Sequence, residues 1–274
     1  MADRFHYLTP MVLPILPRAA GTTLVGLNLD QVVPEVAADA TEDANLTIEV
    51  RLFCAGELIS QETLEVQIVA GKPTPCHFRR HFELDTLGYT EISITADRPY
   101  FRYIITEASF ALVERPDQGT FNVHASMKFS DPVISGMMRD VGEFCLVHPA
   151  QYVSKAEDIG NSVLLINPFD GPVVARLATG DDKELRRRIM PREVALVSLA
   201  DLLNDGEWTC VRYTGSNRYP AWDVRHSYSD PFRINRLDHL EYYRASLTLQ
   251  RLSIFDFAKA RARQVLRTLR LRAN

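Results

Sequence analysis

The stretch Gly160-Asn161-Ser162-Val163-Leu164-Leu165-Ile166-Asn167-Pro168 decides the fold, because an earlier stretch of the chain has the same pattern. That earlier stretch is Gly21-Thr22-Thr23-Leu24-Val25-Gly26-Leu27-Asn28, which lies 139 residues upstream (160 minus 21). The match continues toward the N-terminus without a gap, since Pro10 aligns with Pro149 and Leu8 with Val147. The sequence therefore predicts one β module that is used twice.

The segments that follow recur in the same order in both halves. An acidic loop at residues 32–45 has no counterpart in the second half, but four later segments do. Residues 48–53 align with 173–178, 64–69 with 185–190, 77–84 with 194–199, and 88–94 with 206–213. Few identities are shared, so the ordered series of strands and turns carries the prediction of an internal duplication.

The residue pattern within these segments predicts half-buried strands. In residues 46–54 the side chains of Ile48, Val50, Leu52 and Cys54 share one parity, and this period of two is typical of a strand with one buried face. Turn signals recur about every 8–12 residues, and no alternation of strands with helices is visible. The predicted fold is mainly β, with two tandem antiparallel β-sandwiches of immunoglobulin-like or jelly-roll type. The Asn after each apolar strand, Asn28 and Asn167, loosely resembles immunoglobulin-like accessory domains.

Helices are predicted at three places only. Asp131-Pro132 and Asp230-Pro231 are each typical of a helix N-cap followed by a first-turn proline, and Ile234, Leu237 and Leu240 follow the second pair. Ser253 with Asp256 resembles a capping box that opens a C-terminal helix. The expected organisation is a first sandwich at 1–116, a connecting segment with a short helix at 117–143, a second sandwich at 144–230 and a helical segment at 231–274.

Composition narrows the class of protein. The 274 residues have a formal net charge of −4 and a pI of about 6.0, so no overall basic field favours nucleic acid. The four cysteines are far apart without a C-x-x-C pair, which favours free thiols in a reducing compartment. No signal peptide and no apolar run of about 18 residues is recognisable. We expect a cytoplasmic protein, either free or peripheral to a membrane.

The predicted C-terminal helix has two different faces. Its apolar stripe comprises Phe255, Ala258, Ala262, Leu266 and Leu269, and its basic face comprises Lys259, Arg263, Arg267 and Arg270. Docking on the protein's own sheet or on a partner is the first interpretation. Attachment to an anionic membrane surface is the second, and nucleic-acid binding is the least favoured.

The most polar cluster of candidate ligand-binding residues follows the turn at Gly215. It comprises Asn217, Arg218, Trp222, Arg225 and His226. Exposed aromatic, guanidinium and amide groups at the end of a sandwich can stack on and hydrogen-bond a sugar or a peptide. The alternative interpretation is a turn followed by a buried tryptophan, which is the more common arrangement.

A metal-dependent enzyme of jelly-roll type is a second interpretation of the same region. His226 together with Asp238, His239 or His124 offers ligand types that transition metals accept. However, no tight His-x-His set is present, and His226 shares a strand face with Trp222 and Val224, so neither a metal nor another cofactor is expected. None of the common catalytic motifs is found, which leaves enzymatic activity open but disfavoured.

These observations together predict a non-enzymatic binding or assembly module built from a duplicated β-sandwich. Its basic C-terminal helix is expected to contact a protein partner or an anionic membrane surface. A jelly-roll metal enzyme and a carbohydrate-binding module are the alternatives, and nucleic acid is not an expected partner.

Overall fold

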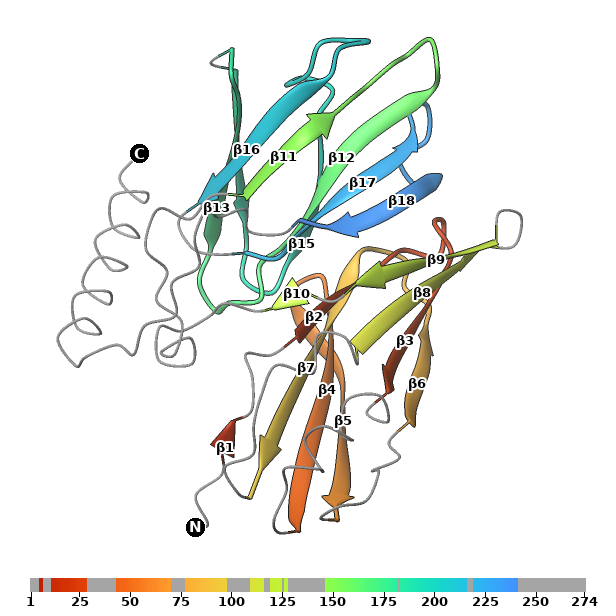
Figure 1. Cartoon of the computed structure of the whole chain (residues 1–274), viewed down its shortest axis with the longest axis vertical. Coiled ribbons are helices and arrows are strands. Elements are labelled where there is room, and N and C mark those ends of the chain that lie inside the picture. The colour runs from red at the N-terminus through yellow and green to blue at the C-terminus, as the bar shows by residue number, and fades with distance from the viewer. Residues whose placement is uncertain are drawn as a thin grey trace, which may run out of the picture. The chain divides into compact units, whose positions relative to one another are not determined.

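The computed structural model describes residues 5–6, 11–28, 43–69, 77–97, 109–115, 119–124, 126–127, 146–181, 183–215 and 219–240. These residues form strands that pair antiparallel in four sheets and contain no helix (Figure 1). The prediction of a mainly β protein is therefore confirmed. The chain divides into two compact units, residues 1–128 with 192–194 and residues 129–191 with 195–274.

The first unit contains two antiparallel sheets. One has the strand order β10-β2-β7-β4-β5, with β1 also paired to β7, and the other has the order β6-β3-β8-β9. The strands are β1 (Phe5–His6), β2 (Met11–Ile15), β3 (Thr22–Asn28), β4 (Ala44–Cys54), β5 (Glu57–Ile68), β6 (His77–Phe82), β7 (Gly88–Ala96), β8 (Ser109–Arg115), β9 (Gly119–His124) and β10 (Ser126–Met127).

The second unit also contains two antiparallel sheets, with the orders β11-β16-β13-β14 and β15-β12-β17-β18. Its strands are β11 (Leu146–Gln151), β12 (Ile159–Ile166), β13 (Val173–Thr179), β14 (Glu184–Ile189), β15 (Val194–Ser198), β16 (Thr209–Gly215), β17 (Ala221–Ser227) and β18 (Ile234–His239). The bounds show that β16 begins at Thr209, three residues later than the sequence pattern placed it.

The two units share one connectivity. If the strands β2 to β9 and β11 to β18 are each numbered one to eight along the chain, both units contain a sheet 1-6-3-4 and a sheet 5-2-7-8. The segments that align in the sequence occupy the same places, for example β3 with β12 and β5 with β14. β9 and β10 lie inside the segment 117–143 and complete the sheets of the first unit.

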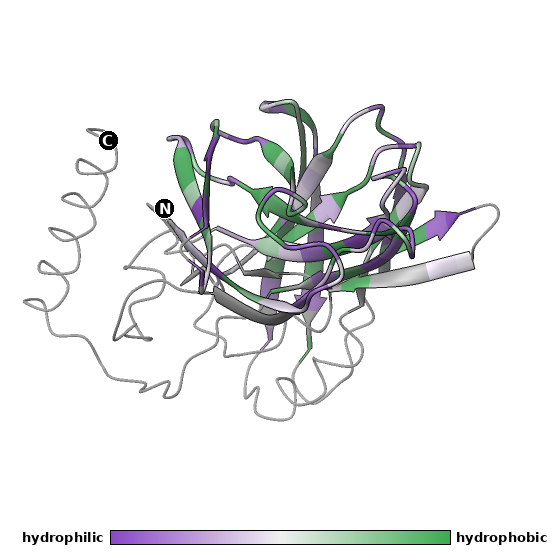
Figure 2. Ribbon diagram, turned by 90° about the horizontal axis from the view of Figure 1, so that it is seen from above, coloured by the Kyte–Doolittle hydropathy of each residue, from purple (hydrophilic) through white to green (hydrophobic). Residues whose placement is uncertain are grey.

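Alternating strand patterns produce the buried faces. In β4 the side chains of Ile48, Val50 and Leu52 are at most 5% exposed, whereas Thr47 and Glu49 between them are half-buried. Apolar and polar residues accordingly follow each other along the ribbons in Figure 2. A bulge between Leu52 and Phe53 in the pairing with β5 interrupts the alternation, and Phe53 is buried as well.

The core of the second unit lies between its two sheets. One cluster of buried side chains takes residues from β13, β14 and β16 on one side and from β12, β15 and β17 on the other. Its members include Val163, Leu165, Leu177, Val211 and Tyr213, all of which are fully buried. Because burying a side chain of this size contributes about 1.5–3 kcal/mol, this cluster is the main source of stability for the unit.

A buried polar contact crosses the same core. The Asn161 side-chain amide donates to the Gln151 Oε1, and the Gln151 amide lies 3.3 Å from the Tyr213 hydroxyl. Burial raises the pKa of the Tyr213 hydroxyl far above its usual range, so the phenol stays protonated. These bonds join β11, β12 and β16 and thereby fix how the strands of the two sheets face each other.

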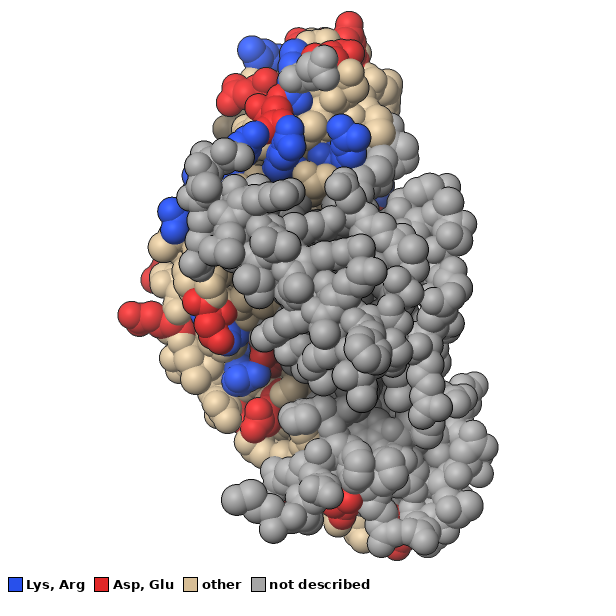
Figure 3. All heavy atoms as spheres, turned by 90° about the vertical axis from the view of Figure 1, so that its left-hand side faces the viewer, with Lys and Arg blue, Asp and Glu red and all other residues tan. Residues whose placement is uncertain are grey.

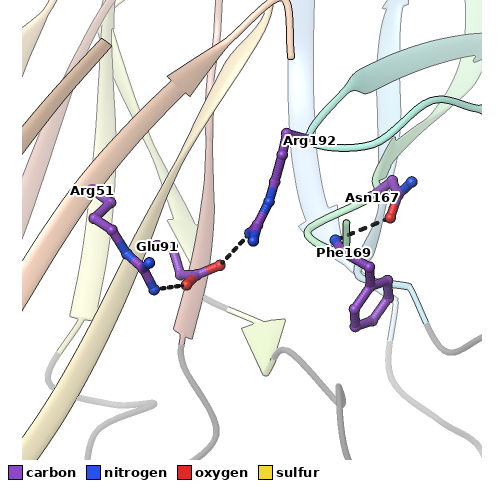
Figure 4. A network of polar contacts seen from close by, with 5 residues as sticks. All are labelled: Arg51, Glu91, Asn167, Phe169 and Arg192. Atoms are coloured by element: carbon purple, nitrogen blue, oxygen red, sulfur yellow. Dashed lines mark hydrogen bonds and ion pairs between the residues drawn. The ribbon is translucent and has the colours of Figure 1, made fainter. Parts of the chain in front are cut away.

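Asn167 in the opening stretch has a structural role. Its Nδ2 lies 2.9 Å from the Gly171 carbonyl oxygen, 3.1 Å from that of Ile189 and 2.9 Å from that of Met190. Its Oδ1 accepts the Phe169 N–H at 3.1 Å (Figure 4). The buried side chain therefore satisfies backbone groups that the end of β14 and the turn after β12 would otherwise leave without partners.

A buried carboxylate lies in the first unit, which includes residues 192–194. Glu91 on β7 is fully buried and accepts from Arg51, while Arg192 Nη1 lies 3.5 Å from its Oε2 (Figure 4). The Arg192 guanidinium also lies 5.0 Å from the ring centre of Phe53, which stacks on Tyr89. Burial raises the pKa of Tyr89 to about 12. Two guanidinium partners offset much of the cost of desolvating this carboxylate.

The helix predicted after Asp230-Pro231 is wrong, because residues 234–239 form strand β18. Ile234 and Leu237 are both buried although they are three positions apart, and this spacing resembles a helical period. The cause is a bulge, since Arg225 pairs with Arg236 while His226 pairs with Ile234, which leaves Asn235 as an extra residue. The helices predicted after Asp131 and from Ser253 lie outside the described residues.

Candidate functional site

The strand pair β12–β17 positions His226 over a glycine. Gly160 is the direct partner of His226 in the antiparallel register. A Cβ placed on Gly160 would lie 2.5 Å from Nδ1 of the imidazole, which is closer than van der Waals contact allows. The ring therefore occupies the space that any other residue at position 160 would fill, which explains why the opening stretch begins with glycine.

Both nitrogens of His226 have partners. Its Nδ1 lies 2.7 Å from the carbonyl oxygen of Ser227, which can only accept, so Nδ1 carries the hydrogen and donates. In the neutral ring Nε2 is then the acceptor for the Ser162 hydroxyl at 2.7 Å. A serine bonded to a histidine is the pairing used by nucleophilic enzymes, but here Ser162 is 1% and His226 6% exposed. A substrate cannot reach this hydroxyl, so the pair is structural.

The same bonds leave His226 no free lone pair for a metal ion. Within the part of the chain that the structure describes, no three His, Cys, Asp or Glu side chains gather in a way that could hold a metal. Asp238 pairs with Asp223 in the β17–β18 register. The Arg236 guanidinium donates to the Asp238 carboxylate at 2.5 Å. Among the described side chains, nothing therefore favours the metal-dependent alternative, and the side chains of the candidate ligands His124 and His239 lie outside them.

Asp158 holds the turn that leads into β12 against the end of β17. Its carboxylate accepts the Ser227 hydroxyl at 2.6 Å and the Ser229 N–H at 3.0 Å, and its backbone has a φ of 53°. These hydrogen bonds, first that from Ser227, lower the pKa of the Asp158 carboxyl. They are present at neutral pH and are lost as the pH falls through this lowered pKa. The turn is thereby fixed next to the aromatic residues described next.

An exposed aromatic surface lies at this end of the second unit. Trp208 has 62% of its surface exposed, and its ring stacks on Tyr152 with centroids 4.7 Å apart and planes 26° apart. The guanidinium carbon of Arg225 lies 5.8 Å from the centre of the Trp208 ring. We call Tyr152, Trp208 and Arg225 the aromatic surface. It exposes a large apolar side chain while the two partners hold the ring in place.

The loop before β16 determines where Trp208 lies. Gly206, with a φ of 77°, donates its N–H to the Val153 carbonyl oxygen at 2.8 Å. The Lys155 N–H donates to the Asp205 carboxylate at 2.8 Å, and Gln151 pairs with Thr209 at the start of β16. Trp208 and Tyr152 are the residues next to that pair, so the register itself brings the two rings together.

Arg225 contributes an unusual donor to the aromatic surface. Its Nε–H is shielded from solvent and meets no hydrogen-bond acceptor among the described residues. A buried donor of this kind costs free energy unless something accepts its hydrogen. Next to the surface, the Tyr152 hydroxyl donates to Glu157 at 3.2 Å, and Lys155 lies 5.6 Å from the ring centre of Tyr228. A ligand at the aromatic surface therefore meets one apolar ring and several charged groups.

The structure separates the site residues that the sequence grouped together. Trp222 is fully buried near the start of β17, and His226 is buried four residues further along the same strand. Of the candidate residues that the structure describes, Arg225 is the one that reaches the aromatic surface. Asn217 and Arg218 lie outside the described residues, as do Lys259, Arg263, Arg267 and Arg270.

Sequence reasoning missed Trp208 and Tyr152. Trp208 was placed inside a strand, although Asp205, Gly206 and Glu207 before it form a polar loop that is typical of an exposed position. Trp222 is followed by Asp223, Arg225 and His226, so its flanking residues are as polar as those of Trp208. The signal that distinguished Trp208 was Gly206, a turn residue two positions before the ring.

Comparisons with known proteins identify no family for this chain. No protein-family model matches it, and no curated protein is significantly similar to it. Across the described ranges, no helix has the length and apolar character required to cross a bilayer.

Proposed function

We propose that this chain is a non-enzymatic binding module and that it holds a protein partner on the aromatic surface of its second unit. The observation that carries the proposal is the 62% exposure of Trp208 between Tyr152 and Arg225. Trp, Tyr and Arg are the residue types that contribute most to protein–protein interfaces. A ring that is held rigidly before binding loses little conformational entropy when a partner arrives.

We also infer that both units are antiparallel β-sandwiches, immunoglobulin-like or jelly-roll in type, that arose from one ancestral module. The shared strand orders 1-6-3-4 and 5-2-7-8 support the duplication, and the single core between the sheets of the second unit supports the sandwich. Repeated modules of this kind provide rigid scaffolds on which loops present binding residues. The aromatic surface depends on such a loop at Trp208.

A carbohydrate-binding module is the second candidate, and the same exposed ring favours it. Sugar rings stack their C–H faces on tryptophan and tyrosine, and guanidinium groups hydrogen-bond their hydroxyls. In this candidate function, Trp208 and Arg225 have the sugar-stacking role that the sequence assigned to Trp222, because the Trp222 ring is inaccessible.

Replacing Trp208 with Ala is expected to abolish the contact with the partner while the fold remains. We expect a loss of about 2 kcal/mol or more in binding, which is roughly thirtyfold in affinity. The test first compares the cellular proteins that the wild type and Trp208→Ala each retain from an extract of the native cells. Calorimetry with the purified partner then measures the affinity of both proteins. A glycan array run with the same two proteins decides between a protein and a sugar.

The matched control for the aromatic surface is Tyr228→Ala. This change removes an aromatic ring of the same unit that lies beside Lys155 rather than beside Trp208. Partner binding should survive the change, because Tyr152, Trp208 and Arg225 all remain in place. Equal retention of every partner and glycan by the wild type and by Trp208→Ala would contradict the proposal.

The C-terminal segment is proposed to attach a cytoplasmic protein to a partner or to an anionic membrane surface. The basic residues Lys259, Arg263, Arg267 and Arg270 would each contribute about 1 kcal/mol near such a surface. In a flotation assay with anionic vesicles we expect the full chain to float and a 1–252 truncation to remain at the bottom. Vesicles of neutral lipid are the control, and equal behaviour of both proteins would remove the membrane from the proposal.

A further inference from the structure

The two equivalent edge strands of the units carry opposite charge. β5 and β14 occupy the same place, the last strand of the sheet 1-6-3-4, in the first and second unit. β5 contains Glu57, Glu62 and Glu65 and no basic residue, whereas β14 contains Arg186, Arg187 and Arg188 with the single acid Glu184. Their formal charges are therefore −3 and +2. Figure 3 shows Lys and Arg side chains interspersed with Asp and Glu at the top of the view, over the second unit.

Each of these strands pairs on one side only among the residues that the structure describes. β5 pairs with β4 over its whole length, and β14 pairs with β13. The outer row of N–H and C=O groups of each strand can therefore accept another strand. β5 is twelve residues long, and near its start Leu58 and Ile59 are 50% and 54% exposed. Two exposed apolar side chains on a long edge are a further sign of a surface that another chain covers.

The charges on β14 are only partly neutralised within the protein. Glu184 accepts from Arg176 and from Arg186, both at 2.6 Å through Nε, and these bonds lower the pKa of its carboxyl. Arg187 and Arg188 are exposed and have no ion pair in the described part of the chain. On β5, Glu62 pairs with Arg80 and Glu65 accepts from Thr47, while Glu57 is exposed. Free charge of opposite sign thus remains on both edges.

Charged edge strands also protect proteins from unwanted pairing, and that role alone is the simpler explanation. Protection alone, however, does not require opposite signs at equivalent positions. With opposite signs, contact between two β5 edges or between two β14 edges brings like charges together, whereas contact between β5 and β14 brings opposite charges together. The arrangement therefore selects one pairing and rejects the other two.

We propose that β14 of one copy of this chain pairs antiparallel with β5 of a second copy, so that the molecules assemble head to tail through their sheet edges. One register places Arg188 opposite Glu65 and Ile189 opposite Leu64, with the solvent-facing residues of both strands on one face. Because the two surfaces differ, the contact repeats from copy to copy and produces a ring or a filament. The inference does not depend on the aromatic surface.

Two charge-reversed variants of the full chain test the pairing. One carries Glu57→Lys and Glu65→Lys on β5, and the other carries Arg187→Glu and Arg188→Glu on β14. Sedimentation velocity should show concentration-dependent association of the wild type that weakens as salt increases, because exposed charges are screened. Each variant alone should associate at least about tenfold more weakly, because cross-strand charge pairs become repulsive.

Mixing the two variants should restore association, since each swapped edge then meets a complementary edge on the other protein. The matched control is Arg212→Glu, which makes the same kind of charge reversal on the exposed face of the inner strand β16 and should leave association unchanged. In the assembled wild type, the amides of 57–68 and 184–189 should gain hydrogen-exchange protection as concentration increases.

Three results would each overturn the pairing: a wild type that stays monomeric, an assembly insensitive to both reversals, or a mixture of the two variants that fails to associate. Trp208→Ala should assemble as the wild type does, because its ring lies outside both edge strands. This last comparison separates the test of edge pairing from that of partner binding.

Discussion

Replacing Trp222 with Ala should lower the free energy of unfolding of the second unit by about 3–5 kcal/mol. The side chain is fully buried on β17, where it lies between the strand partners Leu164 and His239. Removing a buried tryptophan forfeits its transfer free energy and leaves a cavity that the surrounding strands cannot fill. Urea unfolding followed by circular dichroism, together with hydrogen exchange of the β12 and β17 amides, measures the loss.

The second tryptophan of the chain is the matched control for this experiment. Trp208→Ala should lower the same free energy by about 1 kcal/mol or less, because an exposed stacked ring contributes little beyond its contact with Tyr152. The two variants should therefore show opposite effects, with stability lost in one and binding lost in the other. Similar destabilisation by both would contradict the burial assigned to Trp222.

Replacing Gly160 with Ala should destabilise the second unit by about 1–3 kcal/mol. The added methyl group would overlap the His226 imidazole, and the ring is held on both nitrogens, by Ser227 and Ser162. Accommodating it forces the ring off its position and breaks at least one of these bonds. Thermal unfolding of the variant beside the wild type provides the measurement.

A second substitution shows whether the overlap is the cause. His226→Ala removes the ring, so adding Gly160→Ala to it should cost little more, and the two changes should be strongly non-additive. Gly171→Ala is the matched control in the same unit and should leave stability nearly unchanged, because a Cβ at Gly171 would meet no atom within 4 Å. If the effects of Gly160→Ala and His226→Ala simply add, the collision with the imidazole does not account for the glycine.

These experiments bear on how a binding site can be recognised in a β protein. Trp222 and His226 looked like ligand-binding residues because they stand close to Arg225 and Asp223 in the sequence. Both faces of β17 are buried, so Trp222, Asp223 and His226 are all inaccessible. Arg225 is the half-buried member of the strand, and its guanidinium reaches Trp208. Closeness in the sequence therefore indicated the region of the aromatic surface. It did not identify Trp208 and Tyr152, which form that surface together with Arg225.

The local pattern was enough to predict most strands and their order. Period-two alternation at Ile48, Val50 and Leu52 reports one buried face directly, and turn residues such as Ala55-Gly56 mark where the chain reverses. The repeat of Gly21–Asn28 at Gly160–Pro168 predicted equivalent strands, and β3 and β12 do occupy equivalent positions in their sheets. Alternation and turn signals arise between residues that are close in the sequence, so they can be recognised without the structure.

The sequence by itself determined that this protein is mainly β and where most of its strands lie. Only the tertiary structure decided that residues 234–239 form a bulged strand, that Trp208 rather than Trp222 is exposed, and that β5 and β14 are edges of opposite charge. The reason is physical: burial, strand register and sheet edges depend on which strands become neighbours in space. Residues such as Gly160 and His226 lie 66 positions apart and meet only after the sheet has formed.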